Sequence, residues 1–135
     1  MLGAIIGDVV GSVYEFDNTK DYNFHLLTPR SEFTDDTVMT LAVAQWLSEE
    51  ETHSHEYLVR CMRELGLKYP WAGYGGNFKQ WLIEWEPKPY NSWGNGSGMR
   101  VSPVSFYARS LDEALDLAKI SADVTHNHPE GIKGA

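Results

Sequence analysis

The spacing of the apolar residues is the feature that most constrains the fold of this chain. They recur three and four positions apart, which predicts helices over residues 2–14, 34–48, 54–65, 78–85 and 110–120. The alternation of apolar and polar residues that is typical of a half-buried strand is scarce. Glycine- and proline-rich stretches, and a long irregular segment over residues 16–33, separate the helices. The sequence therefore predicts an all-α fold of helices joined by loops.

Short polar residues indicate where several of these helices begin. Thr34 and Ser54 each precede an apolar segment, and side chains of this type accept hydrogen bonds from the N–H groups of a first helical turn. Ser110 and Glu113 have the spacing of a capping box. Gly66 follows the last apolar residue of the third segment, so we expect it to end that helix.

The end of the chain bears on its domain organisation. Pro129 and Glu130 are typical of the first turn of a helix, yet the sequence stops about two turns later. A helix that short is marginal on its own. We therefore expect residues 1–135 to form a single domain that is the N-terminal part of a longer protein, or one that completes its core with a partner chain.

Charge and cysteine content exclude several classes of protein. The 19 acidic and 11 basic residues give a net charge of −8, which disfavours a nucleic-acid-binding surface. Cys61 is the single cysteine, so the chain forms no internal disulfide and no cysteine-rich metal site. A reducing compartment fits this composition, and we expect a cytoplasmic protein.

The N-terminal segment is apolar but does not resemble a targeting signal. No Lys or Arg precedes it, and Asp8 interrupts it well short of the roughly 20 residues that span a membrane. We expect a buried helix, in which Gly3, Gly7 and Gly11 share one face and allow another backbone to approach. A charged Asp8 within this run needs a partner, either a backbone or hydroxyl group or a water held by a metal ion.

Carboxylates gather at the start of the second predicted helix. Residues 34–37 read Thr-Asp-Asp-Thr, and such oxygen donors suit a hard cation such as Mg²⁺. The alternative is an ordinary N-cap followed by acids that favour the helix dipole. Asp8 and Glu15 lie seven residues apart, close to two helical turns, so both carboxylates can face one direction.

A glycine-rich segment, residues 94–98, precedes Met99 and a predicted helix start. It lacks the lysine of a P-loop and is interpreted as a plain flexible loop; the alternative is that its exposed N–H groups bind a phosphate. Two histidine pairs have too few supporting ligands for zinc and are interpreted as capping or surface residues, His53 with His55 and His126 with His128. Of these, His126 is a candidate to line a pocket.

Taken together, four ordered motifs resemble the ADP-ribosylglycohydrolase family, which includes the dinitrogenase reductase-activating glycohydrolase. They are Gly3-Ala-Ile-Ile-Gly-Asp-Val-Val-Gly11 through Glu15, Phe33-Thr-Asp-Asp-Thr37, Gly94-Asn-Gly-Ser-Gly-Met-Arg-Val-Ser-Pro103, and Thr125-His126 through Gly131. Each motif is weak alone, but the four extend over nearly the whole chain in order. The resemblance is therefore specific.

The resemblance implies a fold, a reaction and a set of site residues. It implies a compact orthogonal all-α bundle that holds two Mg²⁺ ions in a cleft and hydrolyses the glycosidic bond of an ADP-ribosylated protein or small molecule, releasing ADP-ribose. It implies metal ligands at Thr34, Asp35 and Asp36, and catalytic carboxylates among Glu15, Asp35 and Asp36. The implied substrate-binding residues are Asn95, Gly96, Ser97, Gly98, Met99 and His126.

One expected motif is missing from the sequence. Family members carry a second metal-binding stretch, Asp-x-Asp-Thr or Ser, well after the Thr-His region, and these 135 residues contain none. We therefore expect an incomplete bundle and an incomplete metal site. The alternative is a non-catalytic module derived from this family, one that binds ADP-ribose or that forms oligomers by burying the three N-terminal glycines and the last helix.

Overall fold

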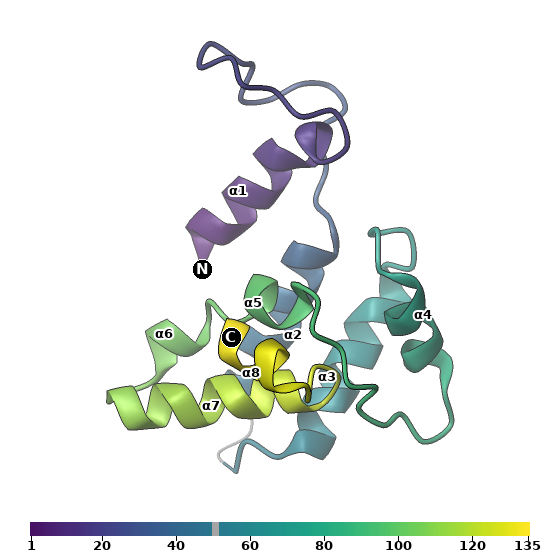
Figure 1. Cartoon of the computed structure of the whole chain (residues 1–135), viewed down its shortest axis with the longest axis vertical. Helices are drawn as coiled ribbons and strands as arrows, with labels where there is room; N and C mark the ends of the chain where they lie inside the picture. The colour runs from purple at the N-terminus through teal and green to yellow at the C-terminus, as the bar shows by residue number, and fades with distance from the viewer. Residues whose placement is uncertain (50–51) are drawn as a thin grey trace.

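The computed structural model describes residues 1–49 and 52–135, and within these ranges every regular element is a helix (Figure 1). In chain order these are α1 Leu2–Gly11, the 3₁₀ helix η1 Ser12–Tyr14, α2 Asp35–Glu49, α3 His55–Lys68, α4 Gly76–Ile83, α5 Gly96–Arg100, α6 Val104–Tyr107, α7 Leu111–Asp123 and α8 Pro129–Gly134. The predicted all-α bundle is confirmed. Residues 16–33 form the long loop that the sequence predicts.

The core is centred on α2 and α3, which pack side by side. Its most deeply buried apolar side chains on these two helices are Val38, Met39, Ala42, Val43, Trp46, Leu58, Cys61 and Met62. The indole Nε1 of Trp46 donates a hydrogen bond of 3.1 Å to the carbonyl of Ser54, immediately before α3. The largest buried side chain of α2 therefore also ties the start of α3 to it.

The predicted starts of α2 and α3 are confirmed. The hydroxyl of Thr34 accepts a hydrogen bond of 3.3 Å from the N–H of Asp36. The hydroxyl of Ser54 likewise accepts one of 3.2 Å from the N–H of Tyr57. Both serve N–H groups that have no partner inside the helix, which is why such residues favour helix starts.

The helices α7 and α8 also begin as predicted. Ser110 accepts a hydrogen bond of 3.2 Å from the N–H of Glu113, but the carboxylate of Glu113 accepts from Arg109 and not from Ser110, so half of the capping box forms. Pro129 opens α8, and Nδ1 of His128 accepts a hydrogen bond of 3.1 Å from the first turn. The interpretation of His128 as a capping residue is confirmed.

The prediction that Gly66 ends the third helix is wrong, because α3 continues to Lys68. Gly66 is buried inside α3, where a Cβ atom would lie 2.7 Å from Cδ2 of Leu82 in α4. The glycine therefore serves a close approach between two helices. The sequence suggested a helix end because the contact that requires a glycine at position 66 is made with Leu82, which local spacing does not reveal.

The prediction that the N-terminal helix is buried is also wrong. No residue of α1 is buried, Leu2 and Ile6 are 72% and 61% exposed, and nothing lies within 4 Å of a Cβ placed at Gly3, Gly7 or Gly11. Figure 1 shows α1 and the loop after it standing apart from the remaining helices. Within the described residues, the glycine face of α1 therefore has no close neighbour, and its apolar side chains are at most half-buried.

The last helix, by contrast, is packed against the bundle. Ser97 of α5 donates a hydrogen bond of 2.6 Å to the carbonyl of Gly131, and a Cβ at Gly98 would lie 3.1 Å from the carbonyl oxygen of Gly134. The short α8 thus gains its stability from α5. None of the described helices has both the length and the apolar character that crossing a membrane requires.

Candidate active site

The start of α2 is attached to α1 through Asp8. Its Oδ2 accepts hydrogen bonds from the backbone N–H groups of Thr34 and Thr37, at 2.8 and 3.2 Å, and from the hydroxyl of Thr37 at 2.5 Å. Its Oδ1 accepts one from the hydroxyl of Thr34 at 2.6 Å. Of the two kinds of partner that the sequence leaves open for Asp8, the structure shows backbone and hydroxyl groups, and these bonds leave its carboxylate well satisfied.

Next to this attachment lies a hollow of about 710 Å³, which we call the acidic hollow. Its lining residues come from α1, η1, the start of α2, the segment between α3 and α4, and the region around the start of α5, and they include Asp8, Glu15, Thr34, Asp35, Asp36, Gly73, Asn95 and Met99. Glu15 and the Thr-Asp-Asp stretch, more than fifteen residues apart in sequence, thus face one space. The lining contains four carboxylates and no Lys, Arg or His.

The crowding of carboxylates affects their protonation. Burial raises the pKa of Asp35 to about 6, and the nearby carboxylates of Asp36, Glu15 and Asp8 add to that rise. The pKa of Asp36 is also raised, chiefly by burial and then by Asp8 and Glu15. Among the described residues, no basic side chain lines this hollow to offset the charge of Asp35 and Asp36.

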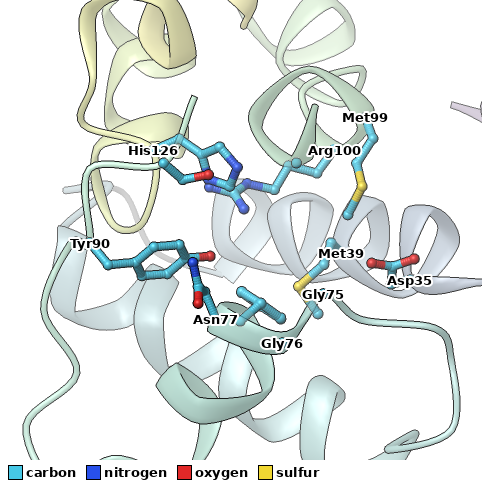
Figure 2. A pocket seen from close by; sticks show the side chains of 12 residues that line it. Asp35, Met39, Gly75, Gly76, Asn77, Tyr90, Met99, Arg100 and His126 are labelled. Atoms are coloured by element: carbon cyan, nitrogen blue, oxygen red, sulfur yellow. The ribbon is translucent and has the colours of Figure 1, made fainter. Parts of the chain in front are cut away.

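A second hollow, of about 390 Å³, adjoins the first. We call it the Arg100 hollow; its lining includes Asp35, Met39, Asn77, Phe78, Tyr90, Ser92, Gly96, Met99, Arg100 and His126. Figure 2 shows Tyr90 and His126 on one side of it and Asp35 and Met99 on the other. Because Asp35 and Met99 line both hollows, the two share a wall.

The predicted substrate-binding residues fall into two groups. Asn95 lines the acidic hollow, Gly96 and His126 line the Arg100 hollow, and Met99 lines both. The remaining two, Ser97 and Gly98, line neither hollow and instead hold α8 against α5.

The glycine-rich segment is not the flexible loop that the sequence predicts, because α5 begins within it, at Gly96. A Cβ at Gly96 would lie 2.7 Å from Cε1 and 2.8 Å from Nε2 of His126. This glycine is therefore required by the imidazole ring that packs against it. No side chain caps the first turn of α5.

Sequence reasoning did not identify Arg100 as a site residue. Its side chain is 1% exposed, and its guanidinium donates hydrogen bonds to the carbonyl of Ser121, at 3.2 and 2.6 Å, and to the hydroxyl of Thr125 at 2.8 Å. Burial lowers the pKa of Arg100 to about 10. In the sequence, the one sign that Arg100 is buried was a basic residue between the apolar Met99 and Val101 in a predicted helix.

Tyr90 was missed as well, since a tyrosine between prolines and glycines has no pattern to mark it. Backbone hydrogen bonds of 3.4 Å from Tyr90 and Ser92 to the carbonyl of Thr125 hold this segment beside His126. The centroids of the Tyr90 and His126 rings are 6.1 Å apart. The segment after α4 thus forms one wall of the Arg100 hollow.

Comparison with known proteins shows the family of this chain. The family model described as ADP-ribosylglycohydrolase matches residues 1–135. The chain belongs to the ADP-ribosylglycohydrolase family. It is 32% identical to human ADP-ribosylhydrolase ARH3, 32% to the mouse protein and 26% to that of Xenopus tropicalis, each match covering 100% of this chain and 46%, 45% and 46% of the relative. This member of the family spans a little less than half the length of the relatives it matches.

The other histidines of this ADP-ribosylglycohydrolase-family chain lie outside both hollows. His53 packs edge-on against the rings of Trp46 and Tyr107, and His55 lies 4.0 Å from the carboxylate of Asp123. Among the residues that the structure describes, no three His, Cys, Asp or Glu side chains are grouped closely enough to hold a metal ion by themselves. Any cation site here therefore has to draw on hydroxyl, carbonyl or water oxygens, or on further residues.

Proposed function

We propose that this chain is the N-terminal part of a Mg²⁺-dependent hydrolase that cleaves the glycosidic bond of an ADP-ribosylated protein or small molecule and releases ADP-ribose. The observation that carries the proposal is the meeting of separate motifs at two adjoining hollows. Glu15, Asp35 and Asp36 face the acidic hollow, and Asp35 also borders the hollow of Gly96 and His126. Membership of the family supports the same reaction class.

The acidic hollow fits a divalent cation. Four carboxylates line it and no basic residue does in the described part of the chain; burial, and then the neighbouring carboxylates, raise the pKa values of Asp35 and Asp36, and a bound cation would favour their ionised forms. We propose Thr34, Asp35 and Asp36 as ligands, and two Mg²⁺ ions in the complete site. Bound there, the cation would neutralise developing charge and orient hydroxyl groups of the substrate.

The protein's own carboxylates have separate tasks in this proposal. Asp8 holds the start of α2 in place and is not a ligand, because four hydrogen bonds already occupy its oxygens. One carboxylate among Glu15, Asp35 and Asp36 takes a proton from the attacking water.

The Arg100 hollow has the size and lining of a small-molecule site. Binding sites of this kind measure about 300–1,000 Å³ and combine apolar walls with a few polar groups. Here Met39, Phe78 and Tyr90 supply apolar surface, and Arg100 supplies positive charge beneath it in a protein of net charge −8. We propose that part of ADP-ribose occupies this hollow, with its diphosphate towards Gly96 and Met99.

Turnover by variants of a full-length protein that contains this chain tests the proposal. In that protein, Asp35→Ala and Asp36→Ala should each reduce the release of ADP-ribose from an ADP-ribosylated peptide by about 100-fold or more, the scale of losing a catalytic group. Asp116→Ala changes an exposed carboxylate of α7 and is the matched control. Unchanged turnover in both Asp35 and Asp36 variants would remove the basis of the assignment.

A second candidate function is favoured by the exposed face of α1. Leu2 and Ile6 are largely exposed, and the glycine face beside them meets nothing in the described residues. A module that pairs through this face with a second chain would bury it. Sedimentation velocity separates the two candidates: a stable oligomer without response to ADP-ribose supports the second, and a monomer that binds ADP-ribose removes it.

A further inference from the structure

A buried guanidinium without an ion pair lies behind the Arg100 hollow. Arg100 is almost wholly inaccessible, and no carboxylate of the described residues forms a salt bridge with it. Burying a charge is costly unless hydrogen bonds compensate it. Its compensating acceptors are the carbonyl of Ser121 and the hydroxyl of Thr125.

The hydrogen bond from Arg100 to Thr125 determines which atom donates in the hydrogen bond between Thr125 and His126. A guanidinium can only donate, so the hydroxyl oxygen of Thr125 accepts from Arg100. The same oxygen lies 2.8 Å from Nδ1 of His126. Thr125 is 0% exposed, and its hydroxyl proton has no other acceptor within the described residues, so this proton is donated to Nδ1.

Consequently, Nδ1 of His126 carries no proton and the proton of the neutral ring is on Nε2. The opposite tautomer would aim two donors at one hydroxyl oxygen and leave the buried hydroxyl proton without an acceptor, which is unfavourable. In the described part of the chain, Nε2 has no hydrogen-bond partner, and its edge of the ring lies against Gly96 in the Arg100 hollow. Figure 2 shows Arg100 beside His126 at this wall.

We propose that Arg100 and Thr125 are positioning residues that hold His126 as its Nε2–H tautomer, so that the ring presents a fixed N–H donor to an acceptor atom of the ligand in the Arg100 hollow. Burial, together with the charge of Arg100, lowers the pKa of His126 to about 4, which keeps the ring neutral near pH 7. A neutral donor of fixed direction favours a ligand atom with a free lone pair, a ring nitrogen or an oxygen. It disfavours a ligand that presents an N–H group at the same place.

Nitrogen NMR of the histidine rings tests the tautomer directly. In the 135-residue chain labelled with ¹⁵N-histidine, long-range proton–nitrogen correlations at pH 7 should show His126 with a protonated Nε2 and an unprotonated Nδ1. A protonated Nδ1, or a rapidly averaged pair, would overturn the proposal. This spectrum needs no substitution, so its outcome does not depend on any variant folding.

Two substitutions at Thr125 test the part played by its hydroxyl. Thr125→Val keeps the shape but removes the hydroxyl, and His126 should then lose its single tautomer. Thr125→Ser retains the hydroxyl and should keep the spectrum of the unaltered chain, while Ser105→Ala removes an exposed hydroxyl of α6 as the matched control. An Nε2–H signal that persists in Thr125→Val would show that the hydroxyl does not set the tautomer and would overturn its role.

Ligand affinity tests whether the Nε2–H group of His126 donates a hydrogen bond to the ligand, and this test rests on the proposed function. With ADP-ribose and Mg²⁺, Thr125→Val should bind about tenfold more weakly, the worth of one hydrogen bond, whereas Thr125→Ser should bind like the unaltered chain. Equal affinity in all three would overturn the donor role. If the unaltered chain has the Nε2–H tautomer but does not bind ADP-ribose, the proposed function fails and the assignment of the tautomer stands.

Discussion

Replacing Asp8 with alanine should release α1 from the bundle. The helix buries no residue of its own, so the four hydrogen bonds that Asp8 accepts from Thr34 and Thr37 are its main attachment to α2. The same carboxylate serves N–H groups at the start of α2, where a negative charge also suits the helix dipole. One substitution therefore removes both an attachment and a cap.

The size of the effect follows from the number and kind of these bonds. A hydrogen bond to a charged group contributes about 1.5–3 kcal/mol, and loss of an N-terminal cap costs about 0.5–2 kcal/mol. Asp8 is half-buried, so water replaces part of what is lost. We expect Asp8→Ala to lower the free energy of unfolding by about 2–4 kcal/mol, and Asp8→Asn by about half as much because its carbonyl can still accept.

Urea denaturation measures the total decrease in the free energy of unfolding, and native-state hydrogen exchange shows which helices lose stability. The amides of α1 should lose their protection in Asp8→Ala, beyond the decrease at core amides of α2 and α3. Thr37→Val removes one of the four bonds, and the double variant should be no less stable than Asp8→Ala alone. A loss below about 0.5 kcal/mol, or unchanged protection of α1, would refute the reasoning.

Three further predictions concern the core, the acidic hollow and the Arg100 hollow. Gly66→Ala should lower the free energy of unfolding by about 1–3 kcal/mol, because the new Cβ would lie 2.7 Å from Leu82; chemical denaturation measures this, and an unchanged midpoint would contradict the packing. Asp35 has a folded pKa of about 6, above its ordinary value of 3.8, so its ionisation opposes folding. The stability gained by Asp35→Asn should therefore be fully present above pH 6 and disappear as the pH falls from about 6 towards 4, which melting curves across this range would check. Gly96→Ala should displace the His126 ring and weaken ADP-ribose binding by about tenfold or more, whereas Gly3→Ala, at a glycine that lines neither hollow and has nothing within 4 Å of its Cβ, should not; equal titration curves for the two variants would argue against the close contact between Gly96 and His126.

The helix starts could be predicted from the sequence because the bonds that form them are local. Thr34, Ser54 and Ser110 each accept a hydrogen bond from an N–H group two or three residues later, so the residue type and its spacing carry the whole signal. The cap at His128 is equally local. The family motifs likewise identified in advance which carboxylates would face a common hollow.

The rest depends on residues distant in sequence. Gly66 is explained by Leu82, and Arg100 by Ser121 and Thr125, and no periodicity links such positions. The prediction that the N-terminal helix is buried was wrong for a different reason. Its apolar composition predicts burial, but composition does not say what would cover it, and within the described residues nothing does.

Calorimetric titration of the chain with ADP-ribose, first in excess Mg²⁺ and then in EDTA, tests the central claim most directly. The two hollows share Asp35, so a cation in the acidic hollow should strengthen binding of a ligand that reaches the Arg100 hollow. The account predicts saturable binding in Mg²⁺ that EDTA weakens at least about tenfold. Absence of heat in both buffers, or equal binding in both, would contradict it.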